Sequence, residues 1–86
     1  MVNENGKNMY RFNEAVMQLV AEVLNLPEVS ASDDFFELGG SSLSAAVLVT
    51  RLEQMTGREI ALRLLLENPG LDAFCQALAA SEGRAA

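Results

Sequence analysis

The helical spacing of apolar residues in the first third of the chain constrains its fold most strongly. From about Met9 to Leu26, apolar side chains recur every three or four positions, at Met9, Phe12, Val16, Leu19, Val20, Val23 and Leu24. This spacing places them on one face of an α-helix, with mostly polar residues opposite. Pro27 ends the pattern, because proline has no amide hydrogen to donate and disfavours helical backbone at the residue before it.

Three more helices are predicted after this one. The second begins at Ser41 or Ser42 and continues to about Met55, before a Thr-Gly pair typical of a left-handed helix stop. The apolar run from Ile60 to Leu66 suits a strand or a short helix, and we choose a helix because residues 61–67 are good helix formers without β-branches. The fourth runs from about Leu71 to Ala80. The predicted fold is an all-α four-helix bundle with three long helices and a short third one.

The ends and the long connection complete this organisation. We expect a disordered N-terminal lead at residues 1–8, one domain at residues 9–80 and a flexible tail at residues 81–86. Residues 27–41 form a long loop, which is unusual in a small domain unless it is functional. Within it we expect one short turn near Ser32 to Phe36, with Ser32 capping the following amides.

Composition excludes several classes of function. The chain has no histidine, so neither a Ser-His nor a Cys-His nucleophile can form, and we expect no catalytic residues and no metal site. Cys75 is the single cysteine, and its place on the apolar stripe of the fourth helix predicts a buried core residue. The net charge of −6 argues against nucleic acid as a partner. No apolar run is long enough for a bilayer and the first residues carry no apolar signal core, so we expect a cytoplasmic protein without membrane contact.

The segment from Asp33 to Leu43 is the strongest functional signal. An acidic, aromatic loop leads into Gly39-Gly40, and two serines then open a helix. Glycines let the backbone turn sharply and keep the approach to a hydroxyl clear, while a helix N-terminus suits a phosphate. The pattern lacks the features of a hydrolase elbow, a Walker loop or an EF-hand. The residues alone leave open whether a phosphate is bound, attached or absent.

Residues 34–43, Asp-Phe-Phe-Glu-Leu-Gly-Gly-Ser-Ser-Leu, resemble the attachment motif of carrier proteins, in particular the peptidyl carrier (thiolation) domains of nonribosomal peptide synthetases. The first helix ending before Pro27, the segment 57–60 and the segment 65–71 are similar to the same family. The resemblance covers roughly residues 9–80. It implies a four-helix bundle of acyl carrier protein type, a monomer, and a carrier without catalytic activity of its own.

The resemblance also implies the site. Ser42 would carry covalent 4′-phosphopantetheine, donated by coenzyme A, and the attachment loop would comprise Leu38, Gly39, Gly40 and Ser41. The alternative for Ser42 is a plain helix N-cap; we hypothesise that Ser41 caps the helix and leaves the Ser42 hydroxyl free. Gly70 stands where relatives often have threonine, which weakens the cap of the fourth helix. The expected partner-docking residues are Leu43, Ala46, Val47 and Thr50 on the second helix, with Leu64 and Leu65 on the third.

The function implied is that of a peptidyl carrier protein, which holds an aminoacyl or peptidyl group as a thioester. Its partners would be a phosphopantetheinyl transferase, an adenylation enzyme or domain, and condensation or tailoring enzymes. One alternative is an acyl carrier protein of polyketide or fatty-acid synthesis. Fatty-acid carriers usually have an acidic second helix, whereas residues 42–50 carry no charge here. An alternative of another class is a non-catalytic helical interaction domain.

Overall fold

The computed structural model describes residues 4–82, which form helices α1 (Glu4–Leu24), α2 (Ser42–Thr56), α3 (Leu62–Glu67) and α4 (Leu71–Glu82). Within these residues the structure contains no β-strand, only an isolated bridge between Asp34 and Gly70. The predicted order of three long helices and a short third one is confirmed. None of the helices in the described part of the chain is long and apolar enough to cross a bilayer.

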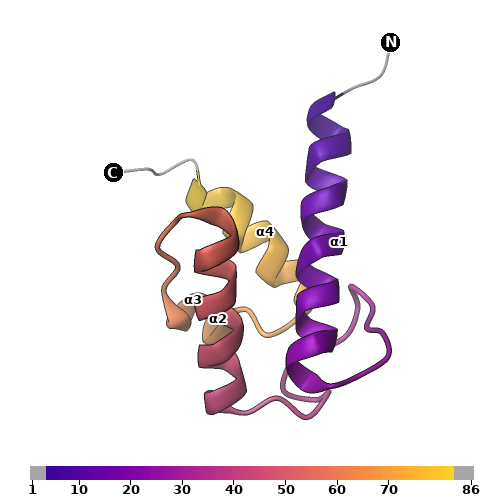
Figure 1. Cartoon of the computed structure of the whole chain (residues 1–86), viewed down its shortest axis with the longest axis vertical. Coiled ribbons are helices and arrows are strands. Elements are labelled where there is room, and N and C mark those ends of the chain that lie inside the picture. Colours follow the sequence, from indigo (N-terminus) through magenta and orange to yellow (C-terminus); the bar gives the residue numbers. More distant parts are fainter. Residues whose placement is uncertain (1–3, 83–86) are drawn as a thin grey trace.

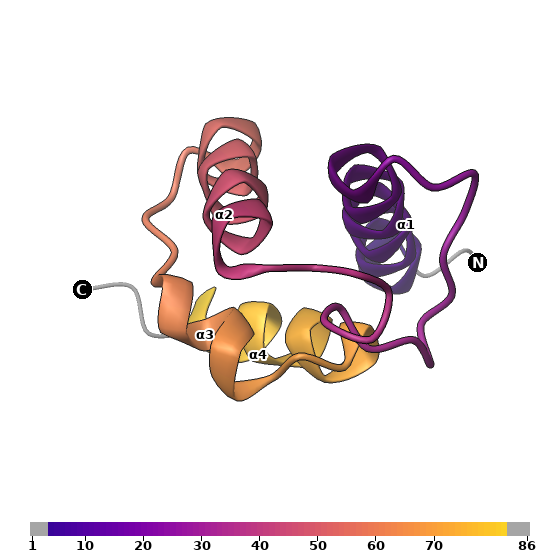
Figure 2. The ribbon, with the colours of Figure 1, turned by 90° about the horizontal axis from the view of Figure 1, so that it is seen from below.

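Helices α1 and α2 lie side by side and run in opposite directions, with the loop of residues 25–41 crossing the end of the bundle between them (Figure 1). Helices α3 and α4 lie together on one side of this pair (Figure 2). The N-terminal end of α1 extends beyond the other helices (Figure 1). This arrangement places the start of α2 at the end of the bundle that the long loop covers.

The core lies where the four helices and the long loop meet. Its fully buried members include Val16 and Val20 from α1, Ala45, Leu48 and Leu52 from α2, Leu65 from α3, Phe74 and Leu78 from α4, and Phe35 from the loop. Helical spacing in the sequence predicts that Ala45, Leu48, Val49, Leu52 and Met55 face the core. The first four are buried, whereas Met55, in the last turn of α2, is 48% exposed.

Helix α1 begins earlier than the sequence predicts. It starts at Glu4, so residues 4–8 are helical and not part of a disordered lead, while residues 1–3 of that expected lead lie outside the described residues. Extending an existing helix needs no new nucleus, so the polar residues before Met9 can join it.

Helix α1 also ends two residues before the predicted Leu26. Asn25 adopts a left-handed backbone with φ of 59°, which asparagine tolerates better than most residues. The Leu26 amide then donates to the Ala21 carbonyl (2.8 Å) and the Asn25 amide to the Glu22 carbonyl (3.1 Å). This is a Schellman cap, so Asn25 ends the helix before Pro27 is reached.

Helix α4 extends to Glu82, past the predicted end at Ala80, so the first two residues of the expected flexible tail are helical. Its last turn has partners from the α2–α3 loop. The Arg58 guanidinium donates to the Leu78 carbonyl (3.4 Å) and the Ser81 hydroxyl (3.2 Å). A cation near the last carbonyls of a helix stabilises its C-terminus. Residues 83–86 lie outside the described part of the chain.

Candidate functional site

The long loop is held against the entry of α4 by backbone hydrogen bonds. The Phe35 amide donates to the Pro69 carbonyl (2.8 Å), next to the bridge between Asp34 and Gly70. The Phe35 side chain is fully buried. The part of the loop that leads into α2 is thus attached to the α3–α4 connection before it reaches the serines.

The same contacts cap α4. Its first two amides donate to loop carbonyls, Leu71 to Asp33 and Asp72 to Ala31, both at 2.9 Å. These carbonyls satisfy amides that a helix N-terminus otherwise leaves without partners. The weak cap expected from Gly70 is therefore offset by the loop, which the sequence alone did not reveal.

The turn expected within the loop is present, but Asp34 organises it and not Ser32. The Asp34 carboxylate accepts from the amides of Phe36 (2.9 Å) and Glu37 (3.0 Å). The Ser32 hydroxyl instead lies 2.9 Å from the Ser30 hydroxyl. A charged carboxylate forms stronger hydrogen bonds to amides than a hydroxyl does, and the residue that organises the turn lies two positions after Ser32.

The two glycines of the attachment loop are required by different structural constraints. Gly39 has φ of +106°, which side chains disfavour, and a Cβ there would lie in open space. A Cβ on Gly40 would instead lie 2.5 Å from Cδ2 and 2.7 Å from the carbonyl oxygen of Phe35. Gly40 is therefore required by the packing of Phe35 beneath it. The sequence suggested other reasons for the two glycines, a sharp turn of the backbone and a clear approach to the serine.

We expect Gly40→Ala to destabilise the fold by about 1–3 kcal/mol, because neither the buried ring nor the Phe35 carbonyl can move freely. Gly70→Ala is the matched control, since a Cβ there meets only the Cβ of Ala73 at 4.0 Å. That variant should stay within about 1 kcal/mol of the wild type. Urea unfolding of both variants measures the difference, and equal stability of the two would contradict the close packing of Gly40 on Phe35.

Ser41 caps α2 through a reciprocal pair with Ser44. The Ser41 hydroxyl accepts from the Ser44 amide (3.2 Å), and the Ser41 amide donates to the Ser44 hydroxyl (2.7 Å). This is a capping box. The capping part of our hypothesis is confirmed, and Ser44 is a member that we did not predict; its spacing of three residues from Ser41 was the available signal.

Ser42 is the first residue of α2 and is exposed. Its hydroxyl forms no hydrogen bond with any residue that the structure describes. The amides of Ser42 and Leu43 begin the helix and have no carbonyl four residues earlier within it. No acidic residue occupies the first turn, so the positive end of the helix dipole is not neutralised there. The arrangement presents one free hydroxyl beside amides that suit an anion.

The expected docking residues on α2 lie at the surface beside Ser42. Leu43 is 76% exposed and Val47 44% exposed, Thr50 is exposed and Ala46 is half-buried. Ala46, Val47 and Thr50 line a shallow hollow of about 270 Å³ with Arg51 and Gln54. This face is open to contact by another molecule.

The two expected docking residues on α3 differ in burial. Leu65 is fully buried in the core, so its assignment to a docking surface is wrong. Leu64 is half-buried and packs against the core, while Leu66 is 47% exposed. With leucine at four of the six positions of α3, periodicity did not identify the inward one.

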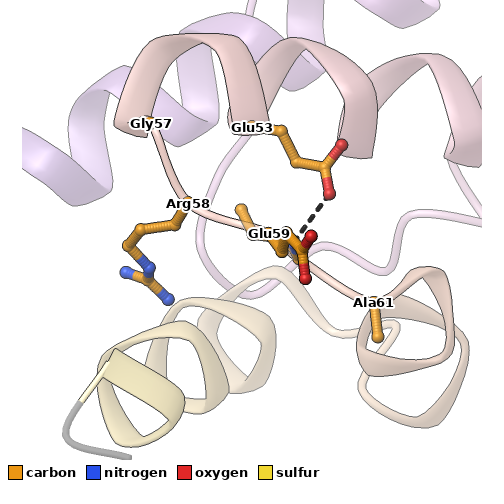
Figure 3. A pocket seen from close by; sticks show the side chains of 6 residues that line it. Glu53, Gly57, Arg58, Glu59 and Ala61 are labelled. Atoms are coloured by element: carbon orange, nitrogen blue, oxygen red, sulfur yellow. Dashed lines mark hydrogen bonds between the residues drawn. The ribbon is translucent and has the colours of Figure 1, made fainter. Parts of the chain in front are cut away.

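A larger surface hollow lies elsewhere, at the C-terminal end of α2 (Figure 3). It measures about 730 Å³ and is lined by Glu53, Gly57, Arg58, Glu59, Ile60 and Ala61. The Glu53 carboxylate accepts from the Ile60 amide (2.8 Å) and so holds the α2–α3 loop (Figure 3). The length of α2, about 20 Å at 1.5 Å per residue, separates this hollow from Ser42. The contacts of its lining residues support the fold.

Cys75 is 2% exposed, as predicted for a core residue. Burial, with a smaller contribution from the nearby Asp72 carboxylate, raises the pKa of its thiol from 9.0 to about 11. Two pKa units leave about a hundredfold less thiolate at neutral pH than an ordinary thiol has. In the described part of the chain no group of three or more metal-ligating side chains occurs.

We therefore expect iodoacetamide at pH 8 to leave Cys75 unmodified in the folded protein and to alkylate it once urea unfolds the chain. The raised folded-state pKa also stabilises the fold fully below pH 9, and this contribution is lost as the pH rises through about 11. The Cys75→Ala variant should lack that alkaline loss. Rapid alkylation of the folded protein, measured by intact mass, would contradict the burial.

The fold and site thus define a small all-α domain that presents one serine hydroxyl at a helix N-terminus. Residues 14–78 match the family model for the phosphopantetheine attachment site, and the chain belongs to this family. The expected cofactor, covalent 4′-phosphopantetheine, is confirmed. The exposed Ser42 hydroxyl and the amides beside it fit such a group, because it is attached through a phosphate.

Similar proteins include gramicidin S synthase 2 from Brevibacillus brevis, 39% identical over 72 residues, which cover 80% of this chain and 2% of that protein. Surfactin synthase subunit 1 from Bacillus subtilis (strain 168) is 38% identical over 63 residues, covering 73% of this chain and 2% of that protein. The chain therefore spans only about 2% of the length of these curated relatives.

Solved structures have a similar fold. A structure described as a non-ribosomal PCP domain is 36% identical, with a TM-score of 0.66 over 74% of this chain and 82% of that one. BlmI, a type-II acyl carrier protein from Streptomyces verticillus, has a TM-score of 0.85 over 91% of this chain and 94% of that one, at 24% identity. The predicted bundle of acyl carrier protein type and the resemblance to peptidyl carrier domains are confirmed.

Proposed function

We propose that Ser42 is the attachment residue of a peptidyl carrier domain, which holds an aminoacyl or peptidyl group for nonribosomal peptide synthetase enzymes. The observation that carries this proposal is that two of the three serines cap the helix and the third does not. Ser41 and Ser44 bond to each other, whereas the Ser42 hydroxyl is exposed and without a hydrogen bond to any described residue. The resemblance of residues 34–43 to the carrier attachment motif supports the same serine.

Attachment is a transfer from coenzyme A to Ser42 Oγ. The Oγ–P bond forms, the pyrophosphate bond of coenzyme A breaks, and adenosine 3′,5′-bisphosphate leaves, while the hydroxyl proton goes to a base of the transferase. The α2 N-terminus contributes the amides and the dipole that favour a phosphate at this position. When attached, the group supplies a thiol on a long arm, which raises the effective concentration of its cargo at partner enzymes.

The remaining roles follow from the same proposal. The carrier domain comprises residues 9–80 and acts as a monomer without catalytic activity of its own. Its partners are a phosphopantetheinyl transferase, an adenylation enzyme or domain, and condensation or tailoring enzymes. We place it in the cytoplasm, where coenzyme A is available. An acyl carrier protein of polyketide or fatty-acid synthesis is disfavoured because residues 42–50 of α2, which include the exposed Leu43 and Val47, carry no charge.

The test is to incubate the protein with coenzyme A and a promiscuous phosphopantetheinyl transferase and to measure its intact mass. We expect a gain of one phosphopantetheine, which tandem mass spectrometry places on Ser42 in the tryptic peptide of residues 12–51. A gain on Ser41 or Ser44 would overturn the site. The absence of any gain would favour the helical interaction domain.

The cargo class is tested on the modified protein. Adenylation enzymes with ATP and amino acids should load it, whereas a malonyl transferase with malonyl coenzyme A should not. Loading by the malonyl transferase alone would assign the protein to polyketide or fatty-acid synthesis.

A further inference from the structure

We propose that Phe35 is a positioning residue for the attachment reaction, acting on Ser42 through Gly40. This inference rests on the proposed function, since it concerns how Ser42 is presented to the transferase. Phe35 is seven positions before Ser42, on the far side of a turn, and its ring does not approach the surface because it is fully buried.

The position of Phe35 is determined from outside the attachment loop. Its amide donates to the Pro69 carbonyl at 2.8 Å, which ties it to the entry of α4. Its ring meets the Phe36 ring edge to face, with centroids 5.2 Å apart and an interplanar angle of 88°. Asp34 is bound on the other side through the bridge to Gly70. These contacts fix the position of the buried ring, and the backbone that follows packs against it.

Gly40 packs directly against the Phe35 ring. Its amide donates to the Phe35 carbonyl at 3.0 Å. A Cβ on Gly40 would overlap the edge of the Phe35 ring, so the ring already occupies the space beneath the Gly40 backbone. The backbone of Gly40 cannot move inward while the ring is present, and the hydrogen bond to Phe35 keeps it from moving outward.

Only Ser41 separates Gly40 from Ser42 along the chain. Ser41 is the N-cap of α2, and Ser42 is the first helical residue. On the other side, Ala45 and Leu48 are fully buried and hold α2 in the core. The Ser42 hydroxyl is thus placed between two anchored points, the core face of α2 and the contact of Gly40 with Phe35. Removing the ring leaves only the backbone hydrogen bond at the second point and does not alter the exposed face of α2.

This arrangement predicts a defect in the chemical step more than in binding. A transfer needs the hydroxyl close to the reacting phosphorus, and a misplacement of about 1 Å costs on the order of a hundredfold in rate. The exposed face formed by Leu43 and Val47 remains available for contact with the transferase. We therefore expect Phe35→Leu to lower kcat about ten- to a hundredfold, with KM for the carrier changed less than threefold.

The matched control is Phe74→Leu, the same substitution at another fully buried phenylalanine, in the first turn of α4. Both variants lose similar core volume, so a general loss of stability affects both. Each is assayed with coenzyme A and the transferase at a temperature where its unfolding curve shows the folded state. We expect Phe74→Leu to stay within about twofold of the wild type in kcat, because its ring does not underlie Gly40. Should Phe35→Leu fail to fold, Phe35→Met replaces it, because the unbranched methionine side chain adapts to irregular core space.

The outcomes separate this inference from the proposed function. A wild-type protein that gains no mass contradicts the assignment of Ser42 itself. A wild type that is modified, with Phe35→Leu and Phe74→Leu equal in kcat, overturns the role of Phe35. A loss that appears only in KM also overturns it, because it would place the effect in docking. Faster hydrogen exchange at the amides of Ser41 and Ser42 in Phe35→Leu, absent in Phe74→Leu, supports it.

Discussion

Ser42→Ala is expected to abolish phosphopantetheine transfer completely, because it removes the acceptor oxygen of the new bond. The folded structure should survive the change, since the Ser42 hydroxyl forms no hydrogen bond within the described chain. Alanine is a good helix former, so the first turn of α2 should keep its backbone. Intact mass after incubation with coenzyme A and the transferase measures the first effect, and circular dichroism during urea unfolding measures the second.

The controls for this prediction are the neighbouring serines. Ser41→Ala and Ser44→Ala each break the capping box, so each should lower the stability by about 0.5–2 kcal/mol. Both variants keep the Ser42 hydroxyl and should still gain one phosphopantetheine. Modification of Ser42→Ala at Ser41, or complete loss of modification in Ser44→Ala while it remains folded, would show that the roles of the serines are assigned wrongly.

Leu65→Ala is expected to destabilise the fold by about 2–5 kcal/mol, the largest expected effect on stability. Leu65 is fully buried, so truncation leaves a cavity among side chains of the core. Leu43→Ala removes the same atoms from a side chain that is 76% exposed, and should change the stability by less than about 0.5 kcal/mol. Urea unfolding of the two variants gives this comparison directly.

In the transfer assay, Leu43→Ala should have a larger effect than Leu65→Ala. Leu43 lies next to Ser42 on the exposed face of α2, so Leu43→Ala should raise KM for the carrier several-fold if an apolar contact binds the transferase there. Leu65→Ala, assayed where it is folded, should keep its KM. A stable Leu65→Ala with weakened transferase binding would return Leu65 to the docking surface and contradict its burial.

The helices could be predicted from the sequence because their signals are local. Periodic apolar residues from Phe12 to Leu24 and the Thr-Gly stop after α2 act within a few residues of the backbone that they shape. The errors lie at boundaries, where alternatives have similar energies. Helix α1 ends at the left-handed Asn25, before Pro27 is reached. It begins at Glu4 because adding polar residues to a helix needs no new nucleus.

The candidate site divides in the same way. The motif around Gly39-Gly40 and the helix opening at Ser42 are contiguous along the chain, so the acceptor could be proposed from the sequence. The pairing of Ser41 with Ser44 was also within reach, since a cap and its partner are three residues apart. The inward leucine of α3 was not, because Leu64, Leu65 and Leu66 are chemically identical and only the neighbours decide which one is covered.

By itself the sequence determined the helical order, the family and the serine proposed for attachment, because each depends on residues close together along the chain. Only the tertiary structure decided that Phe35 lies under Gly40, that the loop carbonyls of Ala31 and Asp33 cap α4, and that Leu65 is buried. These facts depend on which segments meet in the folded core. Packing excludes a side chain from Gly40 because of Phe35, a contact that the spacing of glycines along the chain does not encode.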